Sequence, residues 1–300
     1  MKKTLVVMAA GMGSRFGGLK QITPVDEDGN FIIDYSVYDA KRAGFDKVVF
    51  VIKEENYEDF KNSIGSRLKD KIEVDYAFQK LSDIPSNIDI SSRIKPWGTV
   101  QAVLCAKDKV EGSFVVVNAD DFYGYDSFYQ AAQFLDEHRA DNEQACISYP
   151  FSVTKSDVGA VKRGVLKIEG DIISSIIESS IEVIDEKTAL ATPLDGSKAF
   201  KIDINAFVSM NMFAFQNYMF QLLEDYFHQF FLQDKEVVLS SEALLPECIK
   251  ENIMNKNIVL YNKNSNGKWL GMTYKEDLEF VKREIRNLKN KGEYPSQLWR

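Results

Sequence analysis

The stretch that decides the fold runs from Thr4 to Lys20 and reads TLVVMAAGMGSRFGGLK. It begins with an apolar run, which is typical of a strand buried on both faces of a parallel sheet. A glycine-rich turn that leaves such a strand lets backbone N–H groups converge on an anion. Arg15 and Lys20 add positive charge to that turn. The stretch therefore predicts a loop that holds a polyphosphate.

Two common phosphate-binding motifs fit this loop badly. A Walker A loop requires the pattern GxxxxGK followed by Ser or Thr, which no frame of the loop supplies. The dinucleotide fingerprint GxGxxG fails because Phe16 stands where its third glycine belongs. A looser pattern, GxGxxxG, leaves a nicotinamide-dependent oxidoreductase as an alternative. That alternative is disfavoured, because the ribose-binding residue expected about 20 residues later has no clear strand-end position.

The loop resembles the signature of sugar-phosphate nucleotidyltransferases, which are also called nucleotide-sugar pyrophosphorylases. Later segments keep the order of that family: KPWGTVQAVL at 95–104, VNADDFYG at 117–124, VSMNM at 208–212, SEALLP at 241–246 and KWLGMTY at 268–274. The loop and VNADDFYG are the most specific segments, and the resemblance extends over nearly the whole chain. It implies a single nucleotidyltransferase domain over residues 1–300.

Composition limits the classes of partner. The chain has 300 residues, of which 45% are hydrophobic, and a formal net charge of −8. It is long enough to bury a large core, and its acidity disfavours nucleic acid and anionic membranes as partners. The cysteines and histidines are scattered without zinc-like spacing. We therefore expect Cys105, Cys146 and Cys248 to be reduced thiols in the core.

The N-terminus is not expected to be a signal peptide, although Lys2 and Lys3 precede an apolar run. The run is too short for the apolar region of such a peptide, and it leads directly into the phosphate loop. No stretch approaches the length of a membrane span. We therefore expect a cytoplasmic protein.

Apolar, β-branched runs alternate with helical patterns in the first half of the chain. We predict strands at 5–8, 47–52, 72–77, 114–117 and 144–149, and helices around 33–44, 57–68, 99–106 and 126–138. This alternation predicts an α/β fold with a doubly wound, mostly parallel, Rossmann-like mixed sheet and helices on both faces. Ligands bind at the carboxyl ends of the strands in such sheets, where the glycine loop and Asp120 would lie.

The second half of the chain has a different pattern. Residues 161–168 and 172–177 predict a β-hairpin, the small sugar-binding subregion, whereas 185–201 is predicted to be a loop. A strand at 206–215 and an aromatic helix at 217–231 follow. A capping box at 273–276 begins a last helix, which Gly292 ends.

These patterns divide the domain into three parts. We expect a nucleotide-binding half at about 1–150, a sugar-binding half at about 151–262, and a C-terminal strand and helix at about 263–300. The last helix packs either on the domain or on a partner subunit, which leaves a homo-oligomer open.

The resemblance implies transfer of a nucleotidyl group from a nucleoside triphosphate to a sugar 1-phosphate, with release of pyrophosphate. Because the attacking phosphate oxygen is already anionic, this reaction needs cations, backbone N–H groups and Mg2+ more than a strong base. We expect Arg15 to hold the departing pyrophosphate and Lys20 to reach the transferred phosphate. Asp120 is the expected Mg2+ ligand, since hard oxygen ligands suit that ion.

Two acidic residues in the second half of the chain are candidates for the second metal ligand. Glu242 is the nearer candidate, although it could instead be an acid at a helix N-terminus, and Asp203 is the weaker option.

The resemblance also implies a nucleotide site, made by residues of the loop and of two later turns: Ala9, Ala10, Gly11, Gly13, Ser14, Gln79, Gly98 and Thr99. Gln79 could hydrogen-bond a pyrimidine edge, which favours UTP or TTP, or it could be an exposed residue at a strand end. Thr99 could be no more than a helix cap.

The sugar site departs from the family pattern. Many relatives carry Glu-Lys-Pro after the second hairpin strand, with the lysine on the sugar phosphate, whereas this chain reads Glu-Ser-Ser at 178–180. Arg163 could replace the missing lysine, and Gly164 could admit a sugar hydroxyl to the backbone. With Asp121 and Glu178 they form the predicted sugar site. The missing lysine keeps two alternatives: a catalytically weak or inactive regulatory relative that binds sugar nucleotides, and a cytidylyltransferase for a small phosphoalcohol.

Overall fold

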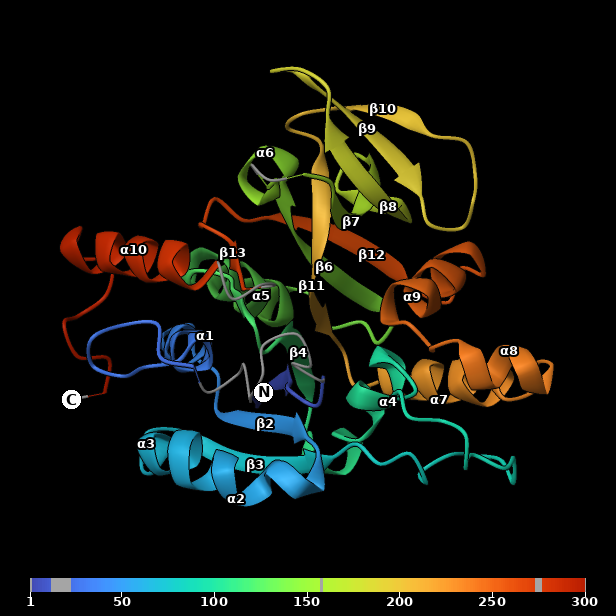
Figure 1. The fold of residues 1–300 in the computed structure, drawn as a ribbon, viewed down its shortest axis with the longest axis horizontal. Helices are drawn as coiled ribbons and strands as arrows, with labels where there is room; N and C mark the ends of the chain where they lie inside the picture. Colours follow the sequence, from blue (N-terminus) through green and yellow to red (C-terminus); the bar gives the residue numbers. More distant parts are fainter. Residues whose placement is uncertain (1, 12–22, 157–158, 273–276, 300) are drawn as a thin grey trace.

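The computed structural model describes residues 2–11, 23–156, 159–272 and 277–299. The first half of the chain forms a parallel sheet in the strand order β3-β2-β1-β4 (Figure 1). The strands are β1 (Lys3–Met8), β2 (Lys47–Ile52), β3 (Glu73–Phe78) and β4 (Ser113–Asn118). Each of them coincides, within a residue or two at either end, with a strand that the apolar runs predict.

Helical segments connect these strands and cover both faces of the sheet. They are α1 (Ile32–Arg42), α2 (Tyr57–Phe60), a π-helical turn (Lys61–Gly65), α3 (Ser66–Leu68), α4 (Thr99–Leu104) and α5 (Tyr125–Glu137), with 3-10 turns at Glu54–Asn56 and Lys107–Lys109. Leu5 and Val7 pack in one apolar cluster with α1 and α5, whereas Val6 packs in another with α4. Burial on both faces explains why these strands are continuous apolar runs.

The rest of the chain extends this sheet, apart from two short strands, Asp121–Phe122 and Leu270–Gly271, which pair with each other. Its elements are β5 (Asp121–Phe122), β6 (Glu143–Pro150), α6 (Phe151–Thr154), β7 (Val161–Glu169), β8 (Ile172–Val183), β9 (Thr188–Pro193), β10 (Phe200–Asp203), β11 (Phe207–Phe215), α7 (Met219–Phe230), α8 (Lys235–Ser240), α9 (Leu245–Met254), β12 (Val259–Asn264), β13 (Leu270–Gly271) and α10 (Asp277–Asn290). The strand order is β10-β9-β8-β12-β6-β11-β4-β1-β2-β3, and β7 pairs with β8 and β11. The predicted α/β class with a mixed sheet is confirmed.

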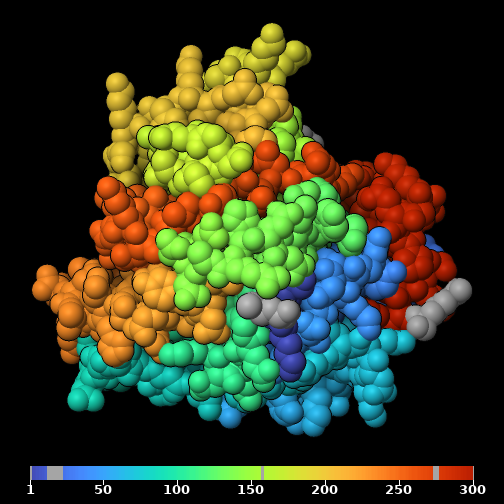
Figure 2. All heavy atoms as spheres, turned by 180° about the vertical axis from the view of Figure 1, so that it is seen from behind, coloured from blue at the N-terminus to red at the C-terminus, as the bar shows by residue number. Residues whose placement is uncertain are grey.

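Some strands of the second half close a ring. β7 pairs with β8, β8 with β12, β12 with β6, β6 with β11, and β11 again with β7. Because an open doubly wound sheet has no such ring, the doubly wound, Rossmann-like description stays a prediction. In Figure 2 the yellow atoms of the region around β9 and β10 form one end of the molecule, and the cyan part of the first half of the chain lies at the other end.

The prediction of a loop over 185–201 is wrong. This range contains β9 and the start of β10, which pair with each other, and β9 also pairs with the far end of β8. Ala189, Ala191 and Pro193 are the buried residues of β9. Alanine has a low strand propensity, so the alternating pattern is weak in the sequence. β12, which runs parallel beside β6, was not predicted either.

The C-terminal helix behaves as its spacing predicts. Val281, Ile285 and Leu288 are buried in an apolar cluster with β13, and Gly292 follows the helix at a φ of +76°. The predicted capping box at 273–276 lies outside the described residues.

The predicted state of the cysteines is confirmed. Cys105, Cys146 and Cys248 are free thiols, and burial raises the pKa of each to about 12. Within the described ranges, no helix has the length and apolar character needed to cross a bilayer.

Candidate functional site

The carboxyl ends of β1 and β4 lie side by side. Met8 pairs with Asn118 in the parallel register, and the Ala119 N–H donates to the Met8 carbonyl over 3.2 Å. Residues 9–11 therefore leave the sheet next to the turn that carries Asp120. The two most specific sequence segments thus begin at one edge of the sheet, as predicted.

The segment after β1 is held by backbone contacts. Ala9 and Ala10 are buried, and the Ala9 N–H donates to the Val51 carbonyl over 2.8 Å. Gly11 is exposed. The other predicted loop residues lie outside the described ranges, so their roles stay predictions: Gly13, Ser14, Arg15 and Lys20.

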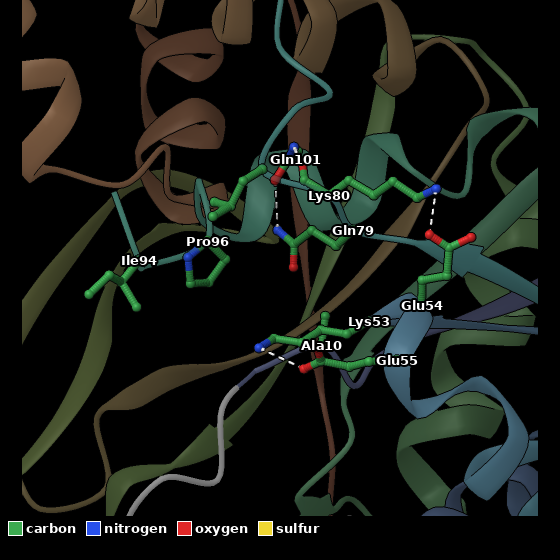
Figure 3. A pocket seen from close by; sticks show the side chains of 10 residues that line it. Ala10, Lys53, Glu54, Glu55, Gln79, Lys80, Ile94, Pro96 and Gln101 are labelled. Carbon is green, nitrogen blue, oxygen red and sulfur yellow. Dashed lines mark hydrogen bonds and ion pairs between the residues drawn. The ribbon is translucent and has the colours of Figure 1, made fainter. Parts of the chain in front are cut away.

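A cavity of about 430 Å³ opens beside Ala10 (Figure 3). Carboxamides, apolar side chains and paired charges line it: Gln79, Gln101, Leu81, Ile94, Pro96, Lys53 with Glu55, and Lys80 with Glu54. A concave site of this size, apolar with a few fixed polar groups, suits a flat heterocyclic ligand.

The hydrogen bonds of Gln101 fix the orientation of the Gln79 carboxamide. Gln101 Nε2 donates to the carbonyls of Lys80 at 2.7 Å and Asp83 at 3.0 Å. Gln101 Oε1 is therefore the acceptor, and Gln79 Nε2 donates to it and to the Gly98 carbonyl, each over 3.1 Å. Both amide protons of Gln79 are thus used. In Figure 3 its oxygen points away from Gln101, toward the opposite side of the cavity.

The turn before α4 fits closely against the segment before α9. Gly98 has a φ of +103°, and an added Cβ would lie 2.9 Å from the backbone N and C of Ala243. The Ala243 N–H donates to the Trp97 carbonyl at 2.7 Å, and its carbonyl accepts from the Val100 N–H at 3.0 Å. Glycine is therefore required at position 98, for its conformation and for the space.

Thr99 caps a different helix from the one it begins. Gly98 is the N-cap residue of α4, and the Thr99 hydroxyl accepts the Leu245 N–H over 2.7 Å. Leu245 is the first residue of α9, so its N–H has no partner within that helix. The alternative in which Thr99 is only the cap of the helix that it begins is therefore wrong, and its hydroxyl joins α4 to α9.

Arg93 organises this turn and was not among the predicted residues. It is buried, and its guanidinium carbon lies 3.8 Å from the ring centroid of Trp97. It donates to backbone carbonyls on both sides of the turn, those of Lys95, Pro96, Val238, Leu239 and Ser241. Because its partners are carbonyls that only the fold brings together, no sequence pattern could indicate this role.

Asp120 and Asp121 follow β4 but have different surroundings. Asp120 is half-buried, and its carbonyl accepts the Met272 N–H at 3.2 Å. Asp121 is 8% exposed, and its Oδ2 accepts from Asn118 Nδ2 at 2.8 Å and lies 3.3 Å from the Tyr123 hydroxyl oxygen. The more accessible Asp120 suits a metal ion shared with a substrate, whereas Asp121 is held in one orientation.

The residues of the predicted sugar site lie together. Gly164 on β7 pairs with Glu178 on β8, and an added Cβ at Gly164 would lie 2.7 Å from Glu178 Oε1. Arg163, the preceding residue, interacts electrostatically with Asp121 and Glu178. Segments far apart in the sequence thus bring two carboxylates to one guanidinium.

Burial changes the ionisation of this cluster. Burial and the nearby Glu247 raise the pKa of Glu178 to about 7, although Arg163 acts in the opposite direction. Burial lowers the pKa of the Arg163 guanidinium, against the effect of Asp121 and Glu178. A carboxyl group that titrates near neutral pH is characteristic of functional sites.

Trp269 completes the cluster and was not among the predicted site residues. The guanidinium carbon of Arg163 lies 4.7 Å from its ring centroid. An added Cβ at Gly271 would lie 2.7 Å from Cζ2 of that ring and nearer still to Cη2, so glycine makes room for the indole. Within the described residues, Arg163 Nε and Trp269 Nε1 are buried without a hydrogen-bond partner. Neighbouring unpartnered donors are uncommon in a folded protein and indicate a polar site that is completed by other molecules.

A Mg2+ site fits Asp120 as a single protein ligand. The ion keeps few protein ligands where substrate phosphates supply the others, and an accessible carboxylate at a strand end meets that need. Within the described residues, no group of three His, Cys, Asp or Glu side chains could hold a metal ion.

The candidates for a second ligand lie elsewhere. Glu242 is exposed in the segment between α8 and α9. Its negative charge raises the pKa of the buried Arg93, against the larger effect of burial. None of the contacts described links it to Asp120. Asp203 lies on β10, at the end of the strand order away from β1 and well removed from β4, so it stays the weaker prediction.

A family model and solved structures show what this chain is similar to. The profile of the family described as nucleotidyl transferase matches residues 4–259. No curated protein matches the chain.

Solved structures share the fold at low sequence identity. An inositol-1-phosphate CTP transferase from T. maritima is 14% identical, with 96% of each chain covered and a TM-score of 0.62. A protein described as a glucose-1-phosphate thymidylyltransferase from Bacillus anthracis, in complex with a sucrose, is 15% identical, with 95% of this chain and 96% of the other covered and a TM-score of 0.63. A UDP-glucose pyrophosphorylase complexed with UDP-glucose is 16% identical, with 96% and 99% covered and a TM-score of 0.58.

Proposed function

Because this chain belongs to the nucleotidyl transferase family, we propose that it transfers a nucleotidyl group from a nucleoside triphosphate to a sugar 1-phosphate and releases pyrophosphate. One observation supports this most strongly: the glycine loop and the Asp120 turn leave adjacent parallel strands, β1 and β4. Ligands bind at that edge of such sheets. The cavity beside Ala10 would take the base. On the other side of the Asp120 turn, Asp121 interacts with Arg163, which also interacts with Glu178.

In the proposed reaction the protein has to bring together two anionic substrates, the nucleoside triphosphate and the sugar 1-phosphate. We assign Arg15 to the departing pyrophosphate, Lys20 to the transferred phosphate, and the backbone of Gly11, Gly13 and Ser14 to the phosphate oxygens. Asp120 would hold Mg2+, and Glu242 stays the proposed second ligand. When bound, the ion supplies positive charge to the triphosphate and to the leaving pyrophosphate.

The fixed carboxamide of Gln79 favours uracil or thymine as the base. Its two N–H donors are used by Gln101 and Gly98, so its oxygen is what it offers to a ligand. The N3–H of uracil or thymine is a donor that matches this oxygen, whereas N3 of cytosine is an acceptor. UTP or TTP is therefore the proposed nucleotide.

The cluster around Arg163 favours a polyhydroxyl acceptor. Asp121 and Glu178 accept hydrogen bonds, Arg163 donates them, and the Trp269 ring offers an apolar face. A sugar ring presents hydroxyl groups and an apolar face to match. A phosphoalcohol without hydroxyl groups would leave these buried polar groups unpaired, which costs free energy. A sugar phosphate is therefore the preferred acceptor.

We assign the two sides of the reaction to two parts of the chain. Residues to about 150 would bind the nucleotide, and residues from about 151 to 262 would bind the sugar phosphate together with Trp269 of the C-terminal part. A cytoplasmic location and assembly through α10 are further proposals. Fractionation and light scattering test them.

Release of pyrophosphate tests the function. UTP, TTP, CTP, ATP and GTP are each combined with a panel of sugar 1-phosphates, and with phosphocholine, in the presence of Mg2+, with Asp120→Ala as the control. We expect release that needs both substrates and is lost in the variant. If no pair of substrates releases pyrophosphate while nucleotide sugars still raise the thermal stability of the protein, this function is contradicted and a regulatory binding protein is favoured. Release with CTP and phosphocholine alone would contradict the choice of base and of acceptor.

A further inference from the structure

One buried hydroxyl group joins the two sides of the site. Tyr123 follows β5, and its side chain is fully buried. Its oxygen lies 3.1 Å from the Asn118 nitrogen, 2.9 Å from the Met210 carbonyl oxygen and 3.3 Å from Asp121 Oδ2. These groups belong to β4, β11 and β5, so one hydroxyl contacts three elements.

The chemistry of a hydroxyl group decides how these contacts are shared. The Asn118 N–H must be the donor, so the Tyr123 oxygen accepts it. The Tyr123 hydroxyl has one proton, which it donates to the nearer acceptor, the Met210 carbonyl oxygen. Donation to the more distant Asp121 Oδ2 is the minor alternative. Burial and the charge of Asp121 raise the pKa of Tyr123 well above its ordinary value, so the proton stays in place.

On one side, this hydroxyl fixes the end of β4. Its bond to the Asn118 backbone holds the residue whose side chain donates to Asp121 Oδ2 over 2.8 Å. The position of Asp121 beside Arg163 therefore depends on Tyr123 through Asn118.

On the other side, it fixes an irregular part of β11. The pairing of β11 with β6 changes register between Ser209 and Phe213, and Asn211 lies there with a φ of +59°. Such a conformation is uncommon outside glycine and persists where the surroundings enforce it. Ser209, just before it, pairs with Gly164 of the acceptor cluster.

We propose that Tyr123 is a positioning residue that sets Asp121 and the β4 turn against the Arg163 cluster. This inference rests on the proposed function, because the acceptor phosphate has to meet the nucleotide between these two parts. Removal of the hydroxyl loosens both anchors and moves the acceptor relative to the triphosphate. A misplacement of about 1 Å is enough to cost up to about a hundredfold in rate.

Tyr149 supplies a matched control. It is also fully buried, and its hydroxyl donates to the Tyr123 backbone carbonyl over 2.7 Å. Its side chain is tied to Ser127 as well. Tyr149→Phe therefore removes a buried hydroxyl from the same network without touching Asn118 or Met210.

The experiment measures kinetics and amide hydrogen exchange on Tyr123→Phe, Tyr149→Phe and the unchanged protein. For Tyr123→Phe we expect the acceptor KM to rise about tenfold, with the nucleotide KM changed less than about twofold. We also expect faster exchange over residues 118–122 and 208–212. For Tyr149→Phe we expect lower thermal stability and unchanged kinetics.

Equal kinetic losses in the two variants, or unchanged exchange in both segments, would overturn the positioning role. If the unchanged protein releases no pyrophosphate, the proposed function fails, and the exchange data alone decide whether Tyr123 joins the segments. If Tyr123→Phe does not fold, Asn118→Ala frees the same oxygen of Asp121 and has to show the same selective rise in the acceptor KM.

Discussion

The two parts of the candidate site that we propose for the nucleotide and for the acceptor are built in different ways. On the nucleotide side, Gln79 and Gln101 are neutral, and their amide protons are used by carbonyl and carboxamide oxygens. On the acceptor side, Asp121, Arg163 and Glu178 are ionisable and half-buried or buried, and Arg163 has an unpartnered Nε. The hydrogen bonds of Gln79 and Gln101 are therefore already made before a ligand binds. The interactions of Arg163 depend on the charges of its neighbours, and its Nε still lacks a hydrogen-bond acceptor.

This difference has a functional consequence. Hydrogen bonds between neutral groups do not change with pH near neutrality, so the selection of the base should be constant there. The acceptor side contains a carboxyl group whose pKa is about 7, so its binding should change over the same range. The variants below test whether the two sides respond separately.

The largest effect is expected where the two sides meet. Asp120→Ala removes the proposed Mg2+ ligand, so kcat should fall by about a hundred- to a thousandfold. Asp136→Ala is the control, since that carboxylate is exposed and pairs with Lys3 away from the site. A loss of less than about tenfold in pyrophosphate release from Asp120→Ala would mean that this residue is not the metal ligand.

Gly98→Ala tests the rigidity of the nucleotide side. The substitution adds a contact with the Ala243 backbone to the strain of a positive φ, so we expect a loss of about 3 kcal/mol in the free energy of unfolding and a higher nucleotide KM. Gly44 has a φ of +88° and open space around an added Cβ, so Gly44→Ala should cost only about 1 kcal/mol. Urea unfolding measures both, and equal losses would show that the contact with Ala243 is unimportant.

Arg163→Ala tests the acceptor side. We expect the acceptor KM to rise about tenfold or more while the nucleotide KM is unchanged, because the guanidinium is the cation of that cluster. The neighbouring Lys162 is exposed, and Lys162→Ala should leave both constants unchanged. Initial rates with each substrate varied in turn measure this, and equal rises in both constants would contradict the separation of the two sides.

The smallest effect concerns Glu178 and pH. Burial raises its pKa from the ordinary value of 4.5 to about 7 in the folded protein. Its contribution to stability is therefore complete below about pH 4.5 and is lost as the pH rises through 7. We expect the acceptor KM to change several-fold between pH 6 and 8, the nucleotide KM to stay constant, and Glu178→Gln to remove the change.

The same variant should be more stable than the unchanged protein at pH 8, because it keeps a neutral group at this buried position. Urea unfolding at pH 6 and at pH 8 measures this. An acceptor KM that keeps its pH dependence in Glu178→Gln would assign the titration to another group.

The parts of the fold that could be predicted from the sequence are those with strong local patterns. β1, β2 and β4 are continuous apolar runs because both of their faces are covered, and such runs are visible without any structure. β9 was missed because small alanines fill two of its buried positions, and β12 because its place beside β6 is set by contacts distant in the sequence.

The residues of the candidate site likewise include some that could be predicted from the sequence and some that could not. Asp121, Arg163, Gly164 and Glu178 were predicted as one sugar site, Arg163 and Gly164 because the chain lacks the lysine of the family pattern, and the structure brings all four together. Arg93, Tyr123 and Trp269 were not predicted as site residues. Their partners are backbone carbonyls, a backbone N–H and a stacked guanidinium that only the folded chain assembles. No local spacing can indicate such contacts.

The reverse reaction tests the central claim most directly. UDP- and TDP-sugars are incubated with labelled pyrophosphate and Mg2+, and the label is followed into the nucleoside triphosphate. We predict that label enters UTP or TTP, that a sugar 1-phosphate appears in equal amount, and that Asp120→Ala abolishes both. Absence of labelled triphosphate with every nucleotide sugar, from a protein that those same compounds stabilise against heat, would contradict the account and leave a binding protein in place of an enzyme.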